Sequence, residues 1–457
     1  MEPANIRFGG GAAGTVLHPA VAAALLITIV LVLLLPRKYA LVPWLSMAFL
    51  TPFAQVVVVG GVHFTVYRIV ALVGLLRLGI TKSPSGRLAG RFNSIDRVFL
   101  LWAFSSLIIF SAQWMQTPAL IRALGNLVDA LGGYFALRFL IQDRDDLERA
   151  IKVLAVVAMI VAAGMLNEQF TSRNVFGLLG GMPLGVAIRE GKARSNGPFE
   201  VYLTAGAFGA TLVPLLVWLW SGAKARMSAA LGLIGATVVA ITSNTSTSLL
   251  AYAGGVVGLC FWPLRKRMRA FRWSLVLTLL ALHLVMKAPV WALIARIDLT
   301  GSSSGFHRYM LVDGCIRHFS NWWLLGVKDY DTWGWDMWDL CNQYVAYAFT
   351  GGLLTLVLFI SVISRAFGRL GTARKAVEGD VKAEWFLWCL CAAVLSHVVA
   401  YFGIGYYDQI QVAWYALLAI VSAAVLEATP VAQAQKVLVP TYPADAAEDW
   451  QVLETNH

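Results

Sequence analysis

The sequence predicts an all-α fold: a polytopic helical integral membrane protein of twelve or thirteen transmembrane spans with one large extracytoplasmic loop. Of the 457 residues, 59% are hydrophobic and only 13% are charged, about half the charged share of an ordinary soluble domain. Apolar runs close to the length that crosses a bilayer recur from His18 to Leu426, separated by short charged or Gly/Pro-containing stretches. This composition excludes a water-soluble enzyme.

The apolar runs define the expected spans in order. They lie at residues 19–35, 40–59, 64–79, 98–113, 124–140, 150–166, 201–220, 228–244, 247–263, 273–290, 342–363, 384–402 and 410–426. Thirteen spans put the N-terminus outside and the C-terminus in the cytoplasm. The second span contains Pro52 and the third contains Arg68; if either is re-entrant, the count is twelve and both ends are cytoplasmic.

The basic residues predict the orientation. Of the 36 Lys and Arg residues, 23 fall in segments expected on one side: residues 37–38, 82–97, 138–152, 224–226, 265–272, 365–382 and Lys436. Positive charge concentrates in cytoplasmic loops, so that side is expected to be the cytoplasm. Although the net charge is +11, the basic residues are not gathered on one face, so no nucleic-acid partner is expected.

The chain is expected to form one transmembrane domain, residues 1–426, followed by a tail. Residues 427–457 contain three prolines and an acidic run, a composition too polar to pack, and are expected to be a disordered cytoplasmic tail. The five cysteines form neither a disulfide framework nor a zinc signature, so no metal site and no cofactor are expected.

Two outer segments, residues 167–200 and 291–341, are too long to be simple turns, and loops of this length are usually functional or disordered. Both contain arginine on the side where positive charge is avoided. Arg194, Arg308 and Arg317 are candidates to hold a polyanionic head group, because guanidinium binds phosphate oxygens bidentately and stays protonated. The alternative is that such arginines pair with nearby carboxylates or reach to lipid head groups.

Several motifs follow one another in these segments. Arg194-Ser-Asn-Gly-Pro-Phe leads into a span, and a Ser/Thr-rich break follows at residues 242–248. Arg308 then precedes Trp322, Trp323 and Gly326, and Asn342-Gln-Tyr344 precedes Gly351 and Gly352. In order and spacing, these motifs resemble those of the O-antigen ligase and polymerase superfamily over about half of the chain.

The resemblance implies a glycosyltransferase-type enzyme that works without nucleotide sugars or metals at the outer face of the inner membrane. Its donor would be an undecaprenyl-pyrophosphate-linked oligosaccharide, and its acceptor a saccharide or lipid core. The product would be an O-antigen or exopolysaccharide, made by a polymerase or a ligase. By resemblance, Arg194 and Arg308 are expected to stabilise the leaving pyrophosphate, with Arg317, Asn342 and Tyr344 at the same substrate site.

One departure concerns the base that takes the proton from the acceptor hydroxyl. Where ligases of this family have a histidine, this sequence has Cys341, and an unperturbed thiol is a poor base. Asp339, His318 and His307 are the candidate catalytic residues in the same loop. Each of the three has an ordinary hydrogen-bonding or capping role as its alternative.

Further polar residues lie near the last spans. Asp408, in a tight outer turn, is expected to close the substrate site from the other side, or to cap the last helix. The competing class of protein is a transporter or flippase of lipid-linked or anionic saccharides. Carriers commonly show two related halves or paired broken helices, and the sequence has neither.

Overall fold

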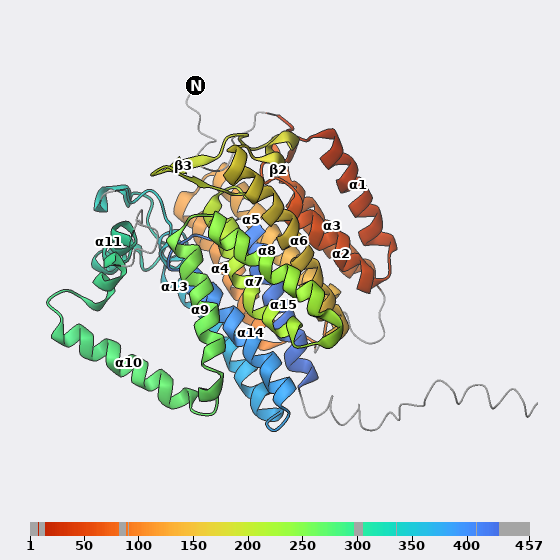
Figure 1. Ribbon diagram of the computed structural model, residues 1–457. Helices are drawn as coiled ribbons and strands as arrows, with labels where there is room; N and C mark the ends of the chain where they lie inside the picture. The colour runs from red at the N-terminus through yellow and green to blue at the C-terminus, as the bar shows by residue number, and fades with distance from the viewer. Residues whose placement is uncertain are drawn as a thin grey trace, which may run out of the picture.

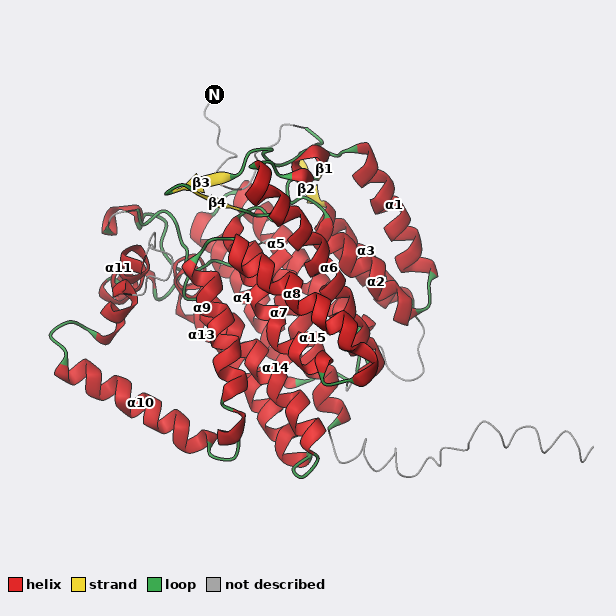
Figure 2. Ribbon diagram, in the orientation of Figure 1, coloured by secondary structure: helices red, strands yellow, loops and turns green. Residues whose placement is uncertain are grey.

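The computed structural model describes residues 8, 14–81, 88–89, 91–296, 305–334, 336–407 and 409–428. Most of this chain is helical (Figures 1 and 2). The first helices are α1 (Pro19–Leu34), α2 (Arg37–Leu50), α3 (Val66–Ile80), α4 (Ser94–Trp114), α5 (Thr117–Leu140), α6 (Arg144–Thr171) and α7 (Tyr202–Trp220). They are followed by α8 (Arg226–Thr242), α9 (Ser246–Cys260), α10 (Met268–Val285), α11 (Gly305–Arg317), α12 (Phe319–Trp322), α13 (Gln343–Ala376), α14 (Val381–Ala400) and α15 (Gln409–Glu427).

Nine helices in the described part of the chain are long and apolar enough to cross a membrane, and α1 and α9 are shorter apolar helices. The chain therefore has the architecture of a multi-pass helical membrane protein. The nine are α4 to α7, α8 with the turn before it, α10 and α13 to α15. Each span expected from the sequence overlaps a helix.

The two β-hairpins lie at the same end of the bundle, which we call the hairpin end (Figure 2). Strand β1 (Val56–Val59) pairs antiparallel with β2 (Val62–Thr65), and β3 (Ala187–Arg189) pairs antiparallel with β4 (Lys192–Arg194). The expected span at 40–59 is therefore wrong in its second half, because the helix ends at Leu50 and the valine run continues as a strand.

Local sequence explains where several helices begin. In α4, Asn93 accepts hydrogen bonds from the first turn while the Asp96 carboxylate accepts from the Asn93 backbone N–H, a reciprocal capping box. The side chain of Asp143 caps α6, and that of Asp380 caps α14, by accepting hydrogen bonds from backbone N–H groups of the first turn. Pro118 stands in the first turn of α5, where a missing N–H costs nothing.

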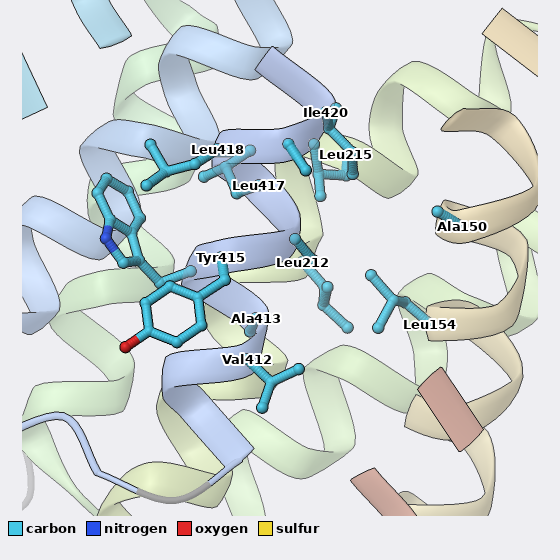
Figure 3. Close-up of a cluster of buried hydrophobic side chains, with 14 of the residues drawn as sticks. Ala150, Leu154, Leu212, Leu215, Val412, Ala413, Tyr415, Leu417, Leu418 and Ile420 are labelled. Carbon is cyan, nitrogen blue, oxygen red and sulfur yellow. The ribbon is translucent and has the colours of Figure 1, made fainter. Parts of the chain in front are cut away.

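Helices α7 and α15 form the centre of the bundle, and most of their side chains are buried. Figure 3 shows α15 side chains such as Leu417 packing against Leu212 and Leu215 of α7. Close approach of α7 and α8 depends on Gly209, where an added Cβ would lie 2.5 Å from the Ala236 carbonyl oxygen. Small residues at such contacts are typical of helices packed in membranes.

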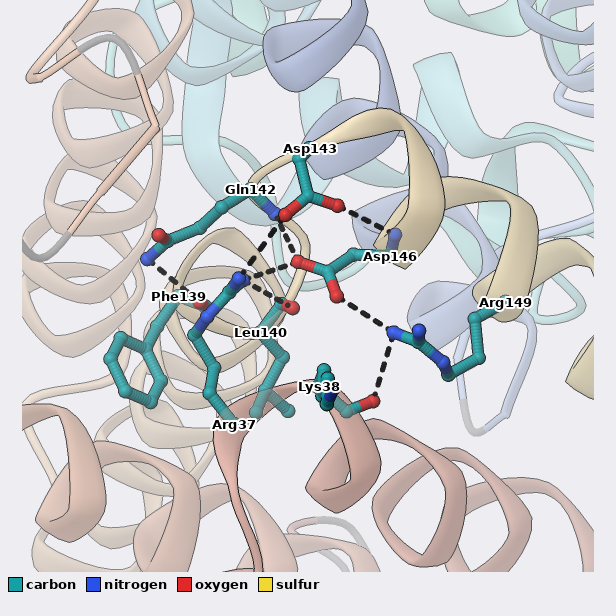
Figure 4. A network of polar contacts seen from close by, with 8 residues as sticks. All are labelled: Arg37, Lys38, Phe139, Leu140, Gln142, Asp143, Asp146 and Arg149. Atoms are coloured by element: carbon teal, nitrogen blue, oxygen red, sulfur yellow. Dashed lines mark hydrogen bonds and ion pairs between the residues drawn. The ribbon is translucent and has the colours of Figure 1, made fainter. Parts of the chain in front are cut away.

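Ion pairs join helices at the opposite end of the bundle, which we call the basic end. Arg138 of α5 lies 3.1 Å from the Asp96 carboxylate of α4, and neither side chain is exposed. In Figure 4, Arg37 contacts Asp143 and Asp146 at the start of α6, and Arg149 lies 2.8 Å from Asp146. The two pairs made by Arg37 hold the short connection 35–36 against the connection 141–143.

Helix α10 differs from the other long helices because none of its residues is buried against the protein. It stands away from the bundle and leads to the segment that contains α11 (Figure 1). Its apolar residues, including Leu275, Leu280 and Leu284, are exposed. An apolar surface of this kind is stable when lipid surrounds it.

Candidate functional site

Buried polar side chains gather at the hairpin end around the turn between α8 and α9, residues 242–248. The hydroxyl-bearing residues of this turn are almost all buried. The turn contacts three other segments: the β4–α7 connection, the start of α11, and the turn 401–407 between α14 and α15. It is therefore the place where the motif residues can meet.

Arg194 enters this region from the last position of β4. It is 7% exposed, its Nη1 donates to the Tyr202 hydroxyl at 3.0 Å, and its guanidinium lies 4.9 Å from the centre of the Tyr202 ring. The buried Glu168 carboxylate accepts from the backbone N–H groups of Asn196 and Gly197, each at 2.8 Å. Glu168 thereby fixes the path of the chain that follows Arg194.

Glycine is required in that path. Gly197 has φ +58°, a left-handed conformation that side chains rarely adopt, and an added Cβ would lie 3.2 Å from Val161. The sequence motif that includes Arg194 and Gly197 thus has a structural basis in this chain. Glu168 was missed from sequence; a carboxylate at the end of an apolar run was its only signal.

Arg308 reaches the same turn from the first turn of α11. It is 7% exposed, and its Nη2 donates to the Thr247 hydroxyl at 2.8 Å. The Thr247 hydroxyl in turn donates to the Gly403 carbonyl at 3.1 Å. Thr247 was not among the residues expected at the site; the Ser/Thr-rich break that contains it was noted only as a motif.

The Arg194 segment is tied to the other part of this turn. The backbone N–H of Ser195 donates to the Thr242 carbonyl at 3.2 Å, and the Asn244 amide donates to the Ala193 carbonyl at 2.6 Å. Gln169 reinforces this contact by donating to the same Thr242 carbonyl at 2.9 Å. The structure therefore brings two arginines that are far apart in sequence to opposite parts of one short turn.

His307, Asp339 and Cys341 form a cluster next to Arg308. The Cys341 Sγ lies 3.3 Å from His307 Nδ1, and His307 Nε2 lies 2.8 Å from the Asp336 carbonyl oxygen. Since a carbonyl only accepts, Nε2 donates, and Nδ1 accepts a hydrogen bond from the Cys341 thiol. His307 and Cys341 are buried, whereas Asp339 is exposed.

The ionisation of this cluster follows from its surroundings. Burial raises the pKa of the Cys341 thiol to about 12, and the Asp339 carboxylate acts in the same direction while Arg308 opposes it. Cys341 is therefore a neutral thiol at pH 7. The pKa of Asp339 is raised by the protein that partly surrounds its carboxylate, with His307 and Arg308 lowering it and Asp336 raising it.

These three side chains are also the candidate metal ligands within the described ranges. A nitrogen of His307, a carboxylate oxygen of Asp339 and the sulfur of Cys341 all lie within 4.8 Å of one another. This cluster could not be predicted from sequence, because more than thirty residues separate His307 from Cys341 and the short ligand spacing of a zinc motif is absent.

Asn342 and Tyr344 lie directly after this cluster. The Asn342 side chain accepts from the backbone N–H groups of Tyr344 and Val345 and so caps α13, and its amide donates to the Phe402 carbonyl at 3.3 Å. The Tyr344 hydroxyl donates to the Val398 carbonyl at 3.3 Å. Asn342 therefore holds the start of α13 against the turn 401–407, and Tyr344 holds it against the end of α14. Asp408 lies outside the described residues.

Arg317 and His318 lie away from the cluster. Arg317 is nine residues beyond Arg308 on α11, which places it about 13.5 Å along the axis and on the opposite face. It forms an ion pair with Asp313 at 2.6 Å and has a largely exposed side chain. His318 stacks on Trp333 with ring centres 4.2 Å apart.

A kink in α13 holds the loop against the bundle. Gly352 has φ +64°, and the freed backbone N–H of Leu353 donates to the Trp323 carbonyl at 2.8 Å. At Gly326 an added Cβ would lie 2.1 Å from the Phe349 carbonyl oxygen. The glycines named in the sequence motif thus allow the backbone of the loop to approach α13.

A separate cleft of about 730 Å³ lies at the basic end. It is lined by the start of α4, the C-terminal half of α13 and the end of α15, and it includes Arg365 and Arg369. Because the N-terminal ends of α13 and α15 lie at the hairpin end, this cleft is at the other end of the bundle from the arginine turn.

No protein-family model matches the chain, and no curated protein matches it.

Proposed function

We propose that the chain is a glycosyltransferase-type enzyme that moves a glycan from an undecaprenyl-pyrophosphate donor to a saccharide acceptor, as an O-antigen or exopolysaccharide polymerase or ligase. The observation that carries the proposal is that Arg308 and the chain on either side of Arg194 contact one buried turn, with the cluster of His307, Asp339 and Cys341 next to Arg308. Two guanidinium groups suit a leaving diphosphate, and an imidazole suits the removal of a proton.

In this mechanism Arg194 and Arg308 hold the pyrophosphate oxygens and stabilise the charge that grows as the bond to the sugar breaks. The acceptor hydroxyl takes the place of the Cys341 thiol at His307 Nδ1 and gives up its proton there as the new glycosidic bond forms. The Asp336 carbonyl holds the ring at Nε2. The Asp339 carboxylate stabilises the imidazolium.

The choice of His307 as base has a geometric reason. Its ring lies within 3.3 Å of the sulfur of Cys341, the residue that replaces the family histidine in the sequence motif. A histidine from α11 can therefore act at the position where the family histidine is missing. His318 is stacked on Trp333 and lies at the other end of α11 from Arg308, so we assign it no part in proton transfer.

The proposal includes an orientation. We propose twelve or thirteen spans in a bacterial inner membrane, with the hairpin end, residues 167–200 and 291–341, at the periplasmic face. The support is the charge bias of the sequence. In intact cells, a membrane-impermeant maleimide should label Asp331→Cys, whereas Lys382→Cys should need permeabilised cells. The reverse labelling pattern would show that the site faces the cytoplasm.

Turnover in detergent solution tests the function against the alternative of a lipid-linked saccharide transporter. The purified chain is incubated with an undecaprenyl-pyrophosphate oligosaccharide and a saccharide acceptor, without nucleotide sugars. A transferase forms longer glycans and releases the pyrophosphate carrier even where no bilayer separates two compartments. A transporter leaves the donor intact, and that result would exclude the proposed activity.

A further inference from the structure

The ligand types in the cluster of His307, Asp339 and Cys341 suit a transition metal. An imidazole, a thiol and a carboxylate are the three side-chain donors that Zn²⁺ uses in proteins. They come from two separate segments, the start of α11 and the chain just before α13, and their donor atoms lie within 4.8 Å of one another.

The distance between the two buried donors is close to that of a metal site. With bonds of about 2.3 Å to sulfur and about 2.05 Å to nitrogen, a tetrahedral Zn²⁺ holds the two atoms about 3.6 Å apart. Cys341 Sγ and His307 Nδ1 are 3.3 Å apart, so a shift of a few tenths of an ångström makes room for the ion. Asp339 is exposed, so its carboxylate can turn toward the same point.

The surroundings of His307 have the pattern of a metal ligand as well. Its second nitrogen donates to the Asp336 carbonyl at 2.8 Å, and metal-binding histidines are usually oriented by such a bond to a carbonyl or carboxylate. Arg308 is next to the cluster, but an ion bound by one thiolate and one carboxylate has no net charge. Repulsion by the guanidinium is therefore weak.

We propose that His307, Asp339 and Cys341 bind one Zn²⁺ ion or a similar divalent transition-metal ion, and that this ion blocks glycan transfer. Binding replaces the thiol proton of Cys341, which passes to solvent, and leaves one coordination position open to water. The ion occupies the Nδ1 lone pair of His307, the same lone pair that accepts a proton in the proposed mechanism. The blocking effect rests on the proposed function, whereas the binding does not.

Metal titration of the purified full-length chain tests the binding. Co²⁺ should give a sulfur-to-cobalt charge-transfer band that saturates at one ion per chain, and Zn²⁺ should displace it. Loss of an outer-shell partner typically lowers metal affinity by about 10- to 100-fold. His307→Ala and Asp339→Asn should each weaken Co²⁺ binding by more than that. Cys341→Ser should abolish the band, whereas the thiol controls Cys315→Ser and Cys260→Ser should keep it.

A second readout protects the result against misfolded variants. In the wild-type chain, bound Zn²⁺ should slow alkylation of Cys341, measured by peptide mass spectrometry, and leave Cys315 unchanged. No Co²⁺ band in the wild-type chain, a band that survives in Cys341→Ser, or no protection of Cys341 would each overturn the metal site.

Transfer assays then separate the two proposals. Stoichiometric Zn²⁺ should lower the wild-type transfer rate by about 100-fold or more, as loss of a general base does, and a chelator should restore it. Binding without any measurable transfer would leave the metal site standing and remove the proposed function. Transfer that continues unchanged with Zn²⁺ bound would overturn the blocking effect alone.

Discussion

Arg308→Lys keeps the charge of the side chain but removes the planar fork that can hold two phosphate oxygens. In the structure, Arg308 is 7% exposed and one of its terminal nitrogens is held by the Thr247 hydroxyl at 2.8 Å. In the proposed mechanism the same guanidinium also binds the donor pyrophosphate. Lysine offers one compact ammonium group in its place.

The magnitude follows from the lost contact. A hydrogen bond to a charged group contributes about 1.5 to 3 kcal/mol, and about 1.4 kcal/mol corresponds to a factor of ten in rate. We therefore expect kcat/KM for glycan transfer to fall by about 10- to 150-fold in Arg308→Lys. The thermal unfolding temperature should change little, because the substitution keeps the charge and most of the side-chain volume.

Arg317→Lys is the matched control, since it makes the same change on the opposite face of the same helix. Its guanidinium pairs with Asp313 and is largely exposed, and such pairs contribute about 0 to 1 kcal/mol. Transfer by this variant should stay within about a factor of two to five of the wild-type rate. Equal losses in both variants, or a wild-type rate in Arg308→Lys, would refute the assignment of the pyrophosphate site.

The remaining predictions concern the base, the thiol and the core. His307→Gln should lower the transfer rate by about 100- to 10,000-fold at unchanged unfolding temperature, whereas His318→Gln should not. The opposite result would identify His318 as the base. Burial raises the pKa of Cys315 from 9.0 to about 12. Maleimide labelling of Cys315 at pH 8 should therefore be at least about 100-fold slower than that of an ordinary thiol, and its rate should rise about tenfold per pH unit. Fast labelling whose rate does not change above pH 9 would contradict this. Asp96→Asn should lower the free energy of unfolding by about 3 to 5 kcal/mol, because it leaves the buried Arg138 guanidinium without its carboxylate. A decrease of less than about 1 kcal/mol, measured by chemical denaturation, would contradict this role of the ion pair.

The helical, membrane-spanning character of the chain could be predicted from composition and apolar runs alone. The error in the second span, 40–59, shows the limit of that reasoning. A short run of valines, Val56–Val59, is compatible with either a helix or a strand. Pro52 and the Gly60-Gly61 turn, with φ of +59° and +79°, decide for a hairpin.

The site could be predicted in part. Arg194, Arg308 and the Ser/Thr-rich break were singled out by their order along the chain, and in the structure Arg308 and the chain on either side of Arg194 contact that break. Contact between His307 and Cys341 could not be read from sequence, because it depends on how α11 folds back against the start of α13. Arg317 is close to Arg308 in sequence, yet helix geometry places it on the other face.

The most direct measurement of the proposed activity is the stoichiometry of a single incubation in which new glycosidic bonds and released undecaprenyl pyrophosphate are counted together. The purified chain, a radiolabelled lipid-linked oligosaccharide and an acceptor are mixed in detergent with a chelator and without nucleotide sugars, and both products are quantified over time. The proposed transferase releases one pyrophosphate carrier for each glycosidic bond formed, at a rate that falls sharply in Arg308→Lys. Intact donor in the presence of folded protein, or carrier released by hydrolysis with no new glycosidic bond, would contradict transfer to a saccharide acceptor.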